Sequence, residues 1–398
     1  MRLIGAVSTV FFLALFAAIS NFSGASGAQP DGRAIFRFET FGDEQLWTDT
    51  LRLNEAIETV SPATALSVGL KVDAEALPPP IIKALSAGQL DVNDPRVTRR
   101  LLEMNAVVGV IGKVAGDRIK SVGVTCALCH STVDDSLAPG IGRRLDGWPN
   151  LDLDVGTIAA LAPGFPDELR DEFRGWGPGK YDPRHHTFDG TNINFLNTPS
   201  LPVVIPPAYG LSGVGFETFT GDGPISYWNS YVGVTQMGGH GSFSDPRIGV
   251  TVTQQPDRVT PLLTALLAYQ LSLDAPAPPP GTVNAVAAAR GKEVFNGAGR
   301  CGTCHIAPTY TDVLSGPSPS VPLLHSAAEV GADPAYAARS ATKMYRTTPL
   351  RALWQHPPYF HDGSATDLLA VVNHYDAALS LGLTAAQKAD LVEFLKSL

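Results

Sequence analysis

The sequence predicts a mainly α-helical protein of two domains, and two observations support this prediction. The five-residue pattern C-x-x-C-H occurs twice, at 126–130 and 301–305, and the two copies hold all four cysteines. A proline-rich stretch, 275–281, lies between them and is typical of a semi-rigid linker. We therefore expect an N-terminal domain over 29–274 and a C-terminal domain over 282–398.

The first segment, 1–28, is predicted to be a cleaved export signal. Arg2 is followed by an apolar run from Leu3 to Ile19 and by small residues at Ser26-Gly27-Ala28, an order typical of secretory signals. An uncleaved membrane anchor is the alternative, although the run is at the short limit for a span. We expect an exported, periplasmic protein.

The charge balance bears on the class of partner. The chain has 29 basic and 38 acidic residues, a formal net charge of −9. An acidic protein is a poor ligand for nucleic acid or for anionic membranes, so neither is an expected partner. The same charge is compatible with a small basic redox protein that docks electrostatically.

The repeated pattern is the attachment site of c-type haem. Its two thiols lie about one helical turn apart, so both can bond to one porphyrin, and the His that follows can reach the iron as proximal ligand. Disulfides would not require a His after each pair. A zinc ribbon has its two cysteine pairs about 15–20 residues apart, far closer than the pairs of this chain at 126–129 and 301–304. The sequence therefore predicts two covalently bound haem c groups. The residues are Cys126, Cys129 and His130 in the first copy, and Cys301, Cys304 and His305 in the second.

Helices are predicted around both motifs. Residues 285–296 are helix-prone and run up to the second motif, and Thr384 with Gln387 forms a capping-box pattern before a terminal helix. In the N-terminal half we expect a helix near 43–60, and an apolar helix that begins at Pro261. The Gly- and Pro-rich stretch 164–247 predicts a long loop-rich insertion.

The chain resembles the bacterial di-haem cytochrome c peroxidase and MauG superfamily. The resemblance rests on the two motifs, on Arg-Thr-Thr-Pro-Leu-Arg at 346–351 and on Pro-Tyr-Phe-His-Asp-Gly at 358–363. It implies two cytochrome c-like haem domains, with long loop-rich insertions in the N-terminal one. It also implies a catalytic first haem that acts on hydrogen peroxide and receives electrons through the second. The electron donor or acceptor would be a small redox protein or a quinol-linked protein. The alternative function is a non-enzymatic electron carrier with both irons six-coordinate.

The resemblance also implies a sixth ligand for the second iron. In the family this ligand lies twelve residues after the Gly of the H-D-G segment, and that count from Gly363 leads to Tyr375. The neighbouring His374 is the alternative, because imidazole is a common iron ligand. Methionine is excluded at this place, because 345–398 contain none.

The first haem site departs from the family pattern. Where the peroxidases carry a catalytic Glu, this chain has Gln236, whose amide cannot shuttle a proton. His240, four residues further on, could supply the missing acid–base group or ligate the iron. We therefore expect Gln236 and His240 at the catalytic site.

Two further family features have candidate residues here. Family members bind calcium through oxygen ligands between the haem domains, and Asn197 is the matching candidate. They also place a Trp between the haems, where this chain has Thr220. Trp176, Trp228 and Trp354 are possible substitutes.

Overall fold

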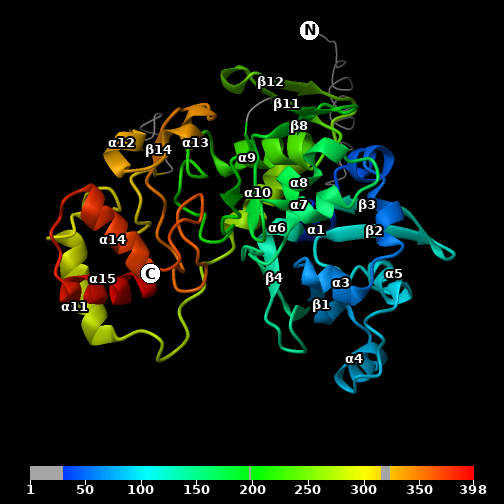
Figure 1. Cartoon of the computed structure of the whole chain (residues 1–398), viewed down its shortest axis with the longest axis horizontal. Coiled ribbons are helices and arrows are strands. Elements are labelled where there is room, and N and C mark those ends of the chain that lie inside the picture. Colours follow the sequence, from blue (N-terminus) through cyan, green and yellow to red (C-terminus); the bar gives the residue numbers. More distant parts are fainter. Residues whose placement is uncertain (1–29, 197–198, 315–322) are drawn as a thin grey trace, which may run out of the picture.

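The computed structural model describes residues 30–196, 199–314 and 323–398. Figure 1 shows a larger body formed by the N-terminal residues and a smaller helical body formed by the C-terminal ones. The predicted export signal lies outside the described residues. Among the residues described, no helix combines the length and the apolar character needed to cross a membrane.

The N-terminal body contains ten short α-helices within the described residues. They are α1 (Gly32–Phe38), α2 (Leu53–Ile57), α3 (Pro62–Ser67), α4 (Pro79–Ser86), α5 (Pro95–Glu103), α6 (Ala127–His130), α7 (Val155–Ala160), α8 (Arg170–Arg174), α9 (Ile225–Tyr231) and α10 (Leu263–Leu271). Two π-helical segments accompany them, η1 (Gln45–Thr50) and η4 (Val232–Gln236). Short 3₁₀ turns are η2 (Ala74–Ala76), η3 (Asp167–Leu169), η5 (Pro246–Ile248) and η6 (Thr260–Leu262).

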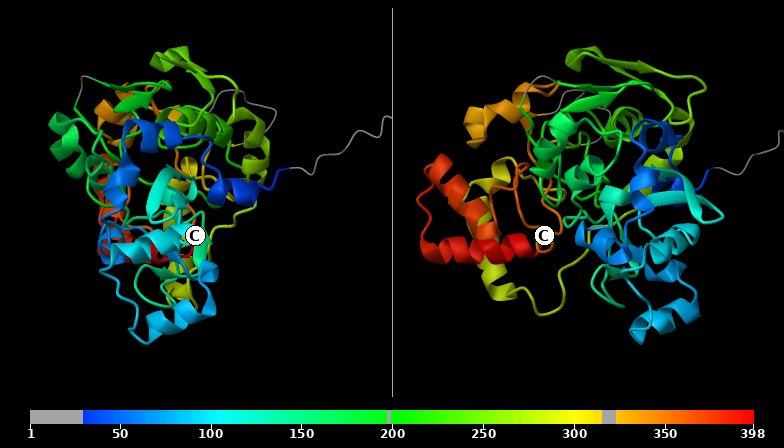
Figure 2. Two further views of the ribbon diagram at one scale, coloured as in Figure 1. Left: turned by 90° about the vertical axis from the view of Figure 1, so that its right-hand side faces the viewer. Right: turned by 45° about the vertical axis from the view of Figure 1, so that its right-hand side comes forward.

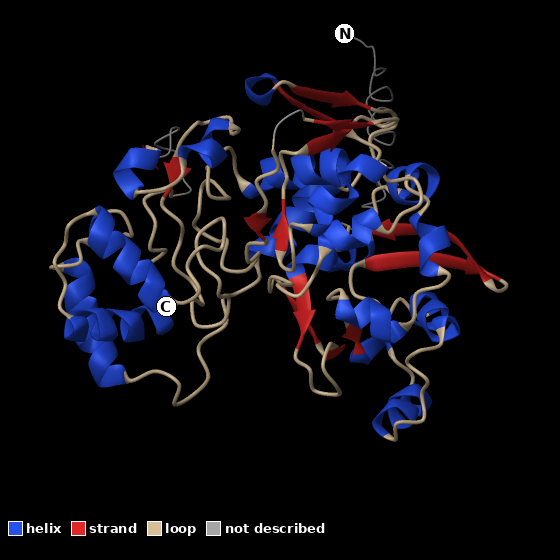
Figure 3. Cartoon of the chain, viewed as in Figure 1, coloured by secondary structure: helices blue, strands red, loops and turns tan. Residues whose placement is uncertain are grey.

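Strands are more frequent here than the sequence predicted (Figure 3). The strands are β1 (Val72–Asp73), β2 (Val110–Ala115), β3 (Arg118–Val124), β4 (Ser131–Val133), β5 (Ile141–Gly142), β6 (Arg144–Asp146), β7 (Lys180–Tyr181), β8 (His186–Phe188), β9 (Ile193–Phe195), β10 (Val203–Val204), β11 (Ser242–Asp245) and β12 (Val250–Thr253). They form two-stranded sheets only, in the order β1-β5, β2-β3, β4-β6, β8-β9, β10-β7 and β11-β12. Helices still account for more residues than strands in this body, in keeping with the mainly α-helical prediction. The short hairpins and ladders are the part of its fold that the sequence did not predict.

The C-terminal body is helical around its own buried cluster. Its elements are α11 (Ala285–Asn296), η7 (Cys301–Thr303), β13 (Leu324–His325), α12 (Ala327–Val330), α13 (Pro334–Ala338), β14 (Tyr345–Arg346), α14 (Leu368–Ala378) and α15 (Ala385–Lys396). Helices α11 and α15 cross closely at Gly291, where a Cβ atom would lie 2.0 Å from the Asp390 carbonyl oxygen. Phe295, Leu391 and Phe394 fill the core beside that crossing.

Several local predictions are confirmed. Helix α11 has the predicted bounds, and α15 begins with the complete capping box of Thr384 and Gln387. The helix expected near 43–60 is instead divided into η1 and α2, because Arg52 has a left-handed backbone conformation (φ 58°). Residues 273–279 have neither helix nor strand, and the Pro276 carbonyl accepts a hydrogen bond from Trp354 (3.0 Å).

Buried carboxylates of the N-terminal body bind groups of the C-terminal body where the two lie side by side (Figures 1 and 2). Asp182 pairs with Arg339 (3.0 Å), and Glu217 pairs with Arg346 (3.1 Å). Asp222 accepts hydrogen bonds from the backbone N–H groups of residues 341 and 342. All three carboxylates are at most 5% exposed, so these contacts fix how the two bodies are placed relative to each other.

Candidate haem-attachment sites

The first motif forms a single helical turn at the end of strand β3. The His130 N–H donates to the Cys126 carbonyl (3.1 Å), which closes the turn. Cys126 and Cys129 are both free rather than disulfide-bonded. Burial raises the pKa of each thiol to about 12. The site therefore presents two unpaired cysteines on one turn, as attachment to a porphyrin requires.

The ring of His130 is oriented by a backbone carbonyl. Its Nδ1 lies 3.1 Å from the Pro206 oxygen, which can only accept, so Nδ1 carries the proton. Burial lowers the pKa of His130 to about 4, which keeps the ring neutral near pH 7. The lone pair is thus on Nε2, and a neutral imidazole ligates a metal through such a lone pair.

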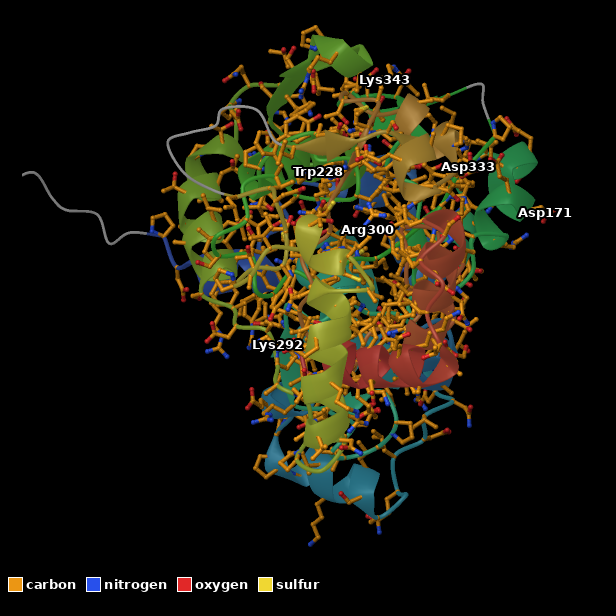
Figure 4. All side chains as sticks on the ribbon, turned by 90° about the vertical axis from the view of Figure 1, so that its left-hand side faces the viewer. Asp171, Trp228, Lys292, Arg300, Asp333 and Lys343 are labelled. Atoms are coloured by element: carbon orange, nitrogen blue, oxygen red, sulfur yellow. The ribbon has the colours of Figure 1, made fainter. Side chains whose placement is uncertain are left out.

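The second motif repeats this arrangement directly after α11. Figure 4 labels Lys292, on α11, and Arg300, which directly precedes the motif. The His305 N–H donates to the Cys301 carbonyl (2.9 Å). Nδ1 of His305 lies 2.9 Å from the Tyr310 carbonyl oxygen, and burial lowers the pKa of this His as well. Both motifs therefore fit a covalently held haem with a neutral proximal His.

Helix α14 presents Tyr375 to the second motif. Burial raises the pKa of Tyr375 to about 12, and the nearby thiols of Cys301 and Cys304 add to the rise. His374 has a different partner, because its Nε2 lies 3.3 Å from the Val330 carbonyl oxygen. Tyr375 thus lies near the thiols, and the ligand of the second iron stays a prediction.

Gln236 ends the π-helical segment η4 and is buried in a polar cluster. Its Oε1 accepts from the Tyr181 hydroxyl (2.8 Å), and its Nε2 donates to the His186 carbonyl (2.9 Å). The Tyr181 hydroxyl also lies 3.3 Å from Nε2 of His186. Burial raises the pKa of Tyr181, and the nearby Cys129 thiol contributes to the rise, so this cluster lies close to the first motif.

His240 does not join that cluster. Its Nδ1 lies 3.4 Å from Oε1 of Gln45, and its backbone pairs with Phe41 and Arg258. The hydrogen-bond partners of Gln236 and His240 do not overlap. The two side chains thus have different hydrogen-bond partners, and their catalytic roles stay predictions.

Tyr181 is the site residue that the sequence analysis missed. It lies in strand β7, and only the fold of 181–186 brings its hydroxyl to both Gln236 and the His186 ring. Burial lowers the pKa of His186 to about 4, and Nδ1 of this ring has no hydrogen-bond partner among the described residues. The available signal in the sequence was the run of polar residues at 181–186.

An aromatic contact joins the two bodies. Trp148 follows Gly147, whose N–H donates to the His130 carbonyl (2.8 Å). The Trp148 ring lies 5.9 Å from that of Trp354 in an edge-to-face arrangement. Of the predicted substitutes for the family Trp, only Trp354 takes part, because Trp176 stacks on Phe173 (4.1 Å) within the N-terminal body.

The third candidate, Trp228 (labelled in Figure 4), lies where the two bodies meet, because it lines a small pocket together with Tyr336 and Arg339 of the C-terminal body. Its indole donates to the Glu217 carbonyl (3.1 Å). Asn197, the calcium candidate, lies outside the described residues.

Among the described residues, Cys304, Asp312 and His325 bring three potential metal-binding atoms within 4.8 Å of one another. His325 is already engaged, because its ring nitrogens lie 3.2 Å from Asp312 and 2.9 Å from Glu329. The group contains only one of the four cysteines. It does not support a zinc site built from the C-x-x-C pairs.

Comparison with known proteins gives distant structural matches only. No family model matches the chain, and no curated protein matches it in sequence. Hydrazine synthase of Kuenenia stuttgartiensis aligns at 19% identity and a TM-score of 0.33, over 50% of this chain and 72% of that one. A MauG-like protein associated with microbial copper homeostasis aligns at 19% identity and a TM-score of 0.36, over 51% and 74%. Both scores are below 0.5, so the assignment of the sites rests on the residues themselves.

Proposed function

We propose that this chain is an exported di-haem c-type cytochrome that works as a peroxidase- or MauG-like oxidoreductase. The observation that carries the proposal is the repeated geometry of the two motifs. Each has two free cysteines on one turn and a His whose Nδ1 is held by a backbone carbonyl. In this proposal Cys126, Cys129 and His130 hold the first haem, and their counterparts at 301–305 hold the second.

A bound haem would supply a redox-active iron at each site. The protein orients the proximal imidazoles through the Pro206 and Tyr310 carbonyls and keeps them neutral by burial. Such a hydrogen bond at Nδ1 fixes the tautomer and raises the basicity of Nε2. Tyr375, next to the second pair of thiols, would close the other face of the second site.

The first site is proposed to be the catalytic one. The polar cluster beside it consists of Gln236, Tyr181 and His186. Gln236 fixes the Tyr181 hydroxyl but cannot itself take up a proton. Tyr181 and His186 are the ionisable members, so they would hold or move a proton there when hydrogen peroxide is the substrate. His240, directed to Gln45, is the second candidate for this role.

Electron transfer between the sites would use the interface of the two bodies. Trp148 and Trp354 touch across it, one near His130 and the other on the C-terminal body. The buried ion pairs of Asp182 and Glu217 hold that interface together. The external electron partner would be a small redox protein, favoured by the net charge of −9, or a quinol-linked protein.

A non-enzymatic electron carrier is the second candidate function. The observation that favours it is the amide of Gln236 in place of a carboxylate, with all its polar atoms engaged. A carrier would have two six-coordinate, low-spin irons. An enzyme would have an open, high-spin first site.

Two measurements on the purified protein test these proposals. A pyridine haemochrome assay after acid–acetone extraction should give two covalently bound haems per chain; one haem, or zinc, would refute the di-haem assignment. Electron paramagnetic resonance of the oxidised protein should then show one high-spin and one low-spin iron, with the high-spin signal changed by peroxide. Two low-spin signals that do not change when peroxide is added would favour the electron carrier.

A further inference from the structure

A chain of ionisable side chains leads from the second motif to the surface of the C-terminal body. Oδ2 of Asp312 lies 3.2 Å from Nε2 of His325, and the other ring nitrogen, Nδ1, lies 2.9 Å from Oε1 of Glu329. One oxygen of Asp312 and one ring nitrogen of His325 also lie within 4.8 Å of the Cys304 sulfur. The side chain of Asp312 is 3% exposed and that of Glu329 is 56% exposed, so the chain connects the motif with solvent.

Three separate segments bring these side chains together. Asp312 follows the second motif, His325 lies in β13, and Glu329 lies on α12. Strand β13 pairs with β14, which places His325 opposite Tyr345, and α12 and β14 lie at the same end of the C-terminal body in Figure 1. Burial raises the pKa of Tyr345 to about 12, so its phenol is uncharged. The imidazole is thus held between two carboxylates.

The geometry requires His325 to be positively charged when both carboxylates are ionised. An ionised carboxylate can only accept a hydrogen bond, and an imidazole donates from both nitrogens only when it is protonated. Asp312 depends on this charge, because its Oδ1 has no hydrogen-bond partner within the described part of the chain. A buried carboxylate that loses its counter-ion is strongly destabilising. His325 is therefore an imidazolium close to Cys304.

The other groups that surround His325 do not alter this conclusion. The Thr347 hydroxyl lies 3.0 Å from Nε2 and carries no charge. Arg346, on β14, directs its guanidinium to Glu217 (3.1 Å). Burial lowers the pKa of His305, the proximal His of the second motif, so this ring is neutral. The charge on the imidazole is thus set by the two carboxylates.

An imidazolium close to Cys304 bears on the redox property of the second haem. This step rests on the proposed function, in which the Cys304 sulfur is bonded to that haem. An electron added at the haem attracts a nearby positive charge, so His325 binds its proton more tightly after reduction. The coupling is reciprocal, so protonation of His325 in turn makes the haem easier to reduce.

We propose that His325 couples proton uptake to electron transfer at the second haem. The ring takes one proton from solvent by way of Glu329 when the site accepts an electron from the external redox partner. It returns the proton when the electron passes on to the first site. Each electron is thus accompanied by one proton, and the buried site gains no net charge.

The pH range of the coupling follows from the surroundings of His325. Burial lowers its pKa, but the hydrogen bonds to Glu329 and Asp312 outweigh burial, so the pKa is raised above 6.5. The reduction potential of the second haem should therefore fall as the pH rises through this pKa, and level off once the ring is neutral in both redox states. We expect a total change of about tenfold in the redox equilibrium constant, which is about 59 mV for one electron.

The test is a spectroelectrochemical titration of the full-length, haem-loaded protein at a series of pH values between about 6 and 10. The low-spin signal reports the second haem. His325→Gln keeps a polar side chain but cannot become charged, so it should lower the potential about tenfold in equilibrium constant at pH 6 and flatten the profile. A haemochrome assay on the same samples counts the haems, so a missing second haem, which would refute the proposed function, is told apart from a haem without proton coupling.

Two glutamate variants complete the experiment. Glu329→Gln removes one of the two carboxylates that raise the pKa of His325, so it should move the fall in potential to lower pH; its exposed position makes it the variant to use if His325→Gln does not fold. Glu168→Gln removes the same charge from an exposed position of the N-terminal body and should leave the profile unchanged. A pH-independent potential in the wild type, or identical profiles for the wild type, His325→Gln and Glu329→Gln, would overturn the proposal.

Discussion

Replacing Asp182 by Asn should weaken the contact between the two bodies of the protein. The carboxylate is 0% exposed and accepts two hydrogen bonds from Arg339 (both 3.0 Å). It also accepts from the Ser200 hydroxyl (2.9 Å) and from the backbone N–H groups of Leu201 (2.6 Å) and Arg184 (3.0 Å). Asn keeps the shape of the side chain but has one accepting atom where Asp has two.

The size of the effect follows from burial. The Arg339 side chain is only 16% exposed, so Asp182→Asn leaves a buried guanidinium without its counter-ion. Breaking a buried pair in this way costs about 3–5 kcal/mol of unfolding free energy. The same change at Asp171, whose side chain is 98% exposed in its pair with Arg174, should cost about 0–1 kcal/mol. Asp171 lies at the edge of the molecule in Figure 4 and is the matched control.

Denaturant unfolding of the haem-loaded protein, followed by circular dichroism, measures both variants. Because the pair joins the N-terminal and C-terminal bodies, Asp182→Asn should also separate the transition into two steps. The reasoning is refuted if Asp182→Asn and Asp171→Asn unfold with the same free energy and the same single transition.

Three further expectations concern the sites. Tyr375→Phe should change the low-spin signal of one haem and His374→Ala should not; the reverse would make His374 the ligand. Tyr181→Phe, which removes the hydrogen bond to Gln236, should slow peroxide-dependent oxidation by about 10²-fold or more, and more than His240→Ala does; the opposite order would assign the proton transfer to His240. Burial lowers the pKa of His186 from 6.5 to about 4. Between these pH values His186 is protonated in the unfolded chain but neutral in the native protein. Stability should therefore fall as the pH falls from about 6.5 to about 4; His186→Phe should flatten this part of a Tm-against-pH curve, and an unchanged slope would show that His186 is not the cause.

The sequence alone determined the features that depend on neighbouring residues. The C-x-x-C-H turns are set within five residues each, because the thiols and the His act through the geometry of one helical turn. Helix α15 was predictable because its capping box spans only Thr384 to Gln387, and α11 because its helix-prone run ends at Gly297. These features need no contact with distant parts of the chain.

The tertiary structure decided what depends on residues far apart in the sequence. Gln236 meets Tyr181 only through the packing of η4 against the hairpins, and His240, four residues away, is carried to Gln45 instead. The π-helical winding of 232–236 has no periodicity signal that would have indicated these different partners. The Asp182–Arg339 pair likewise arises from close packing between distant segments, which local patterns do not encode.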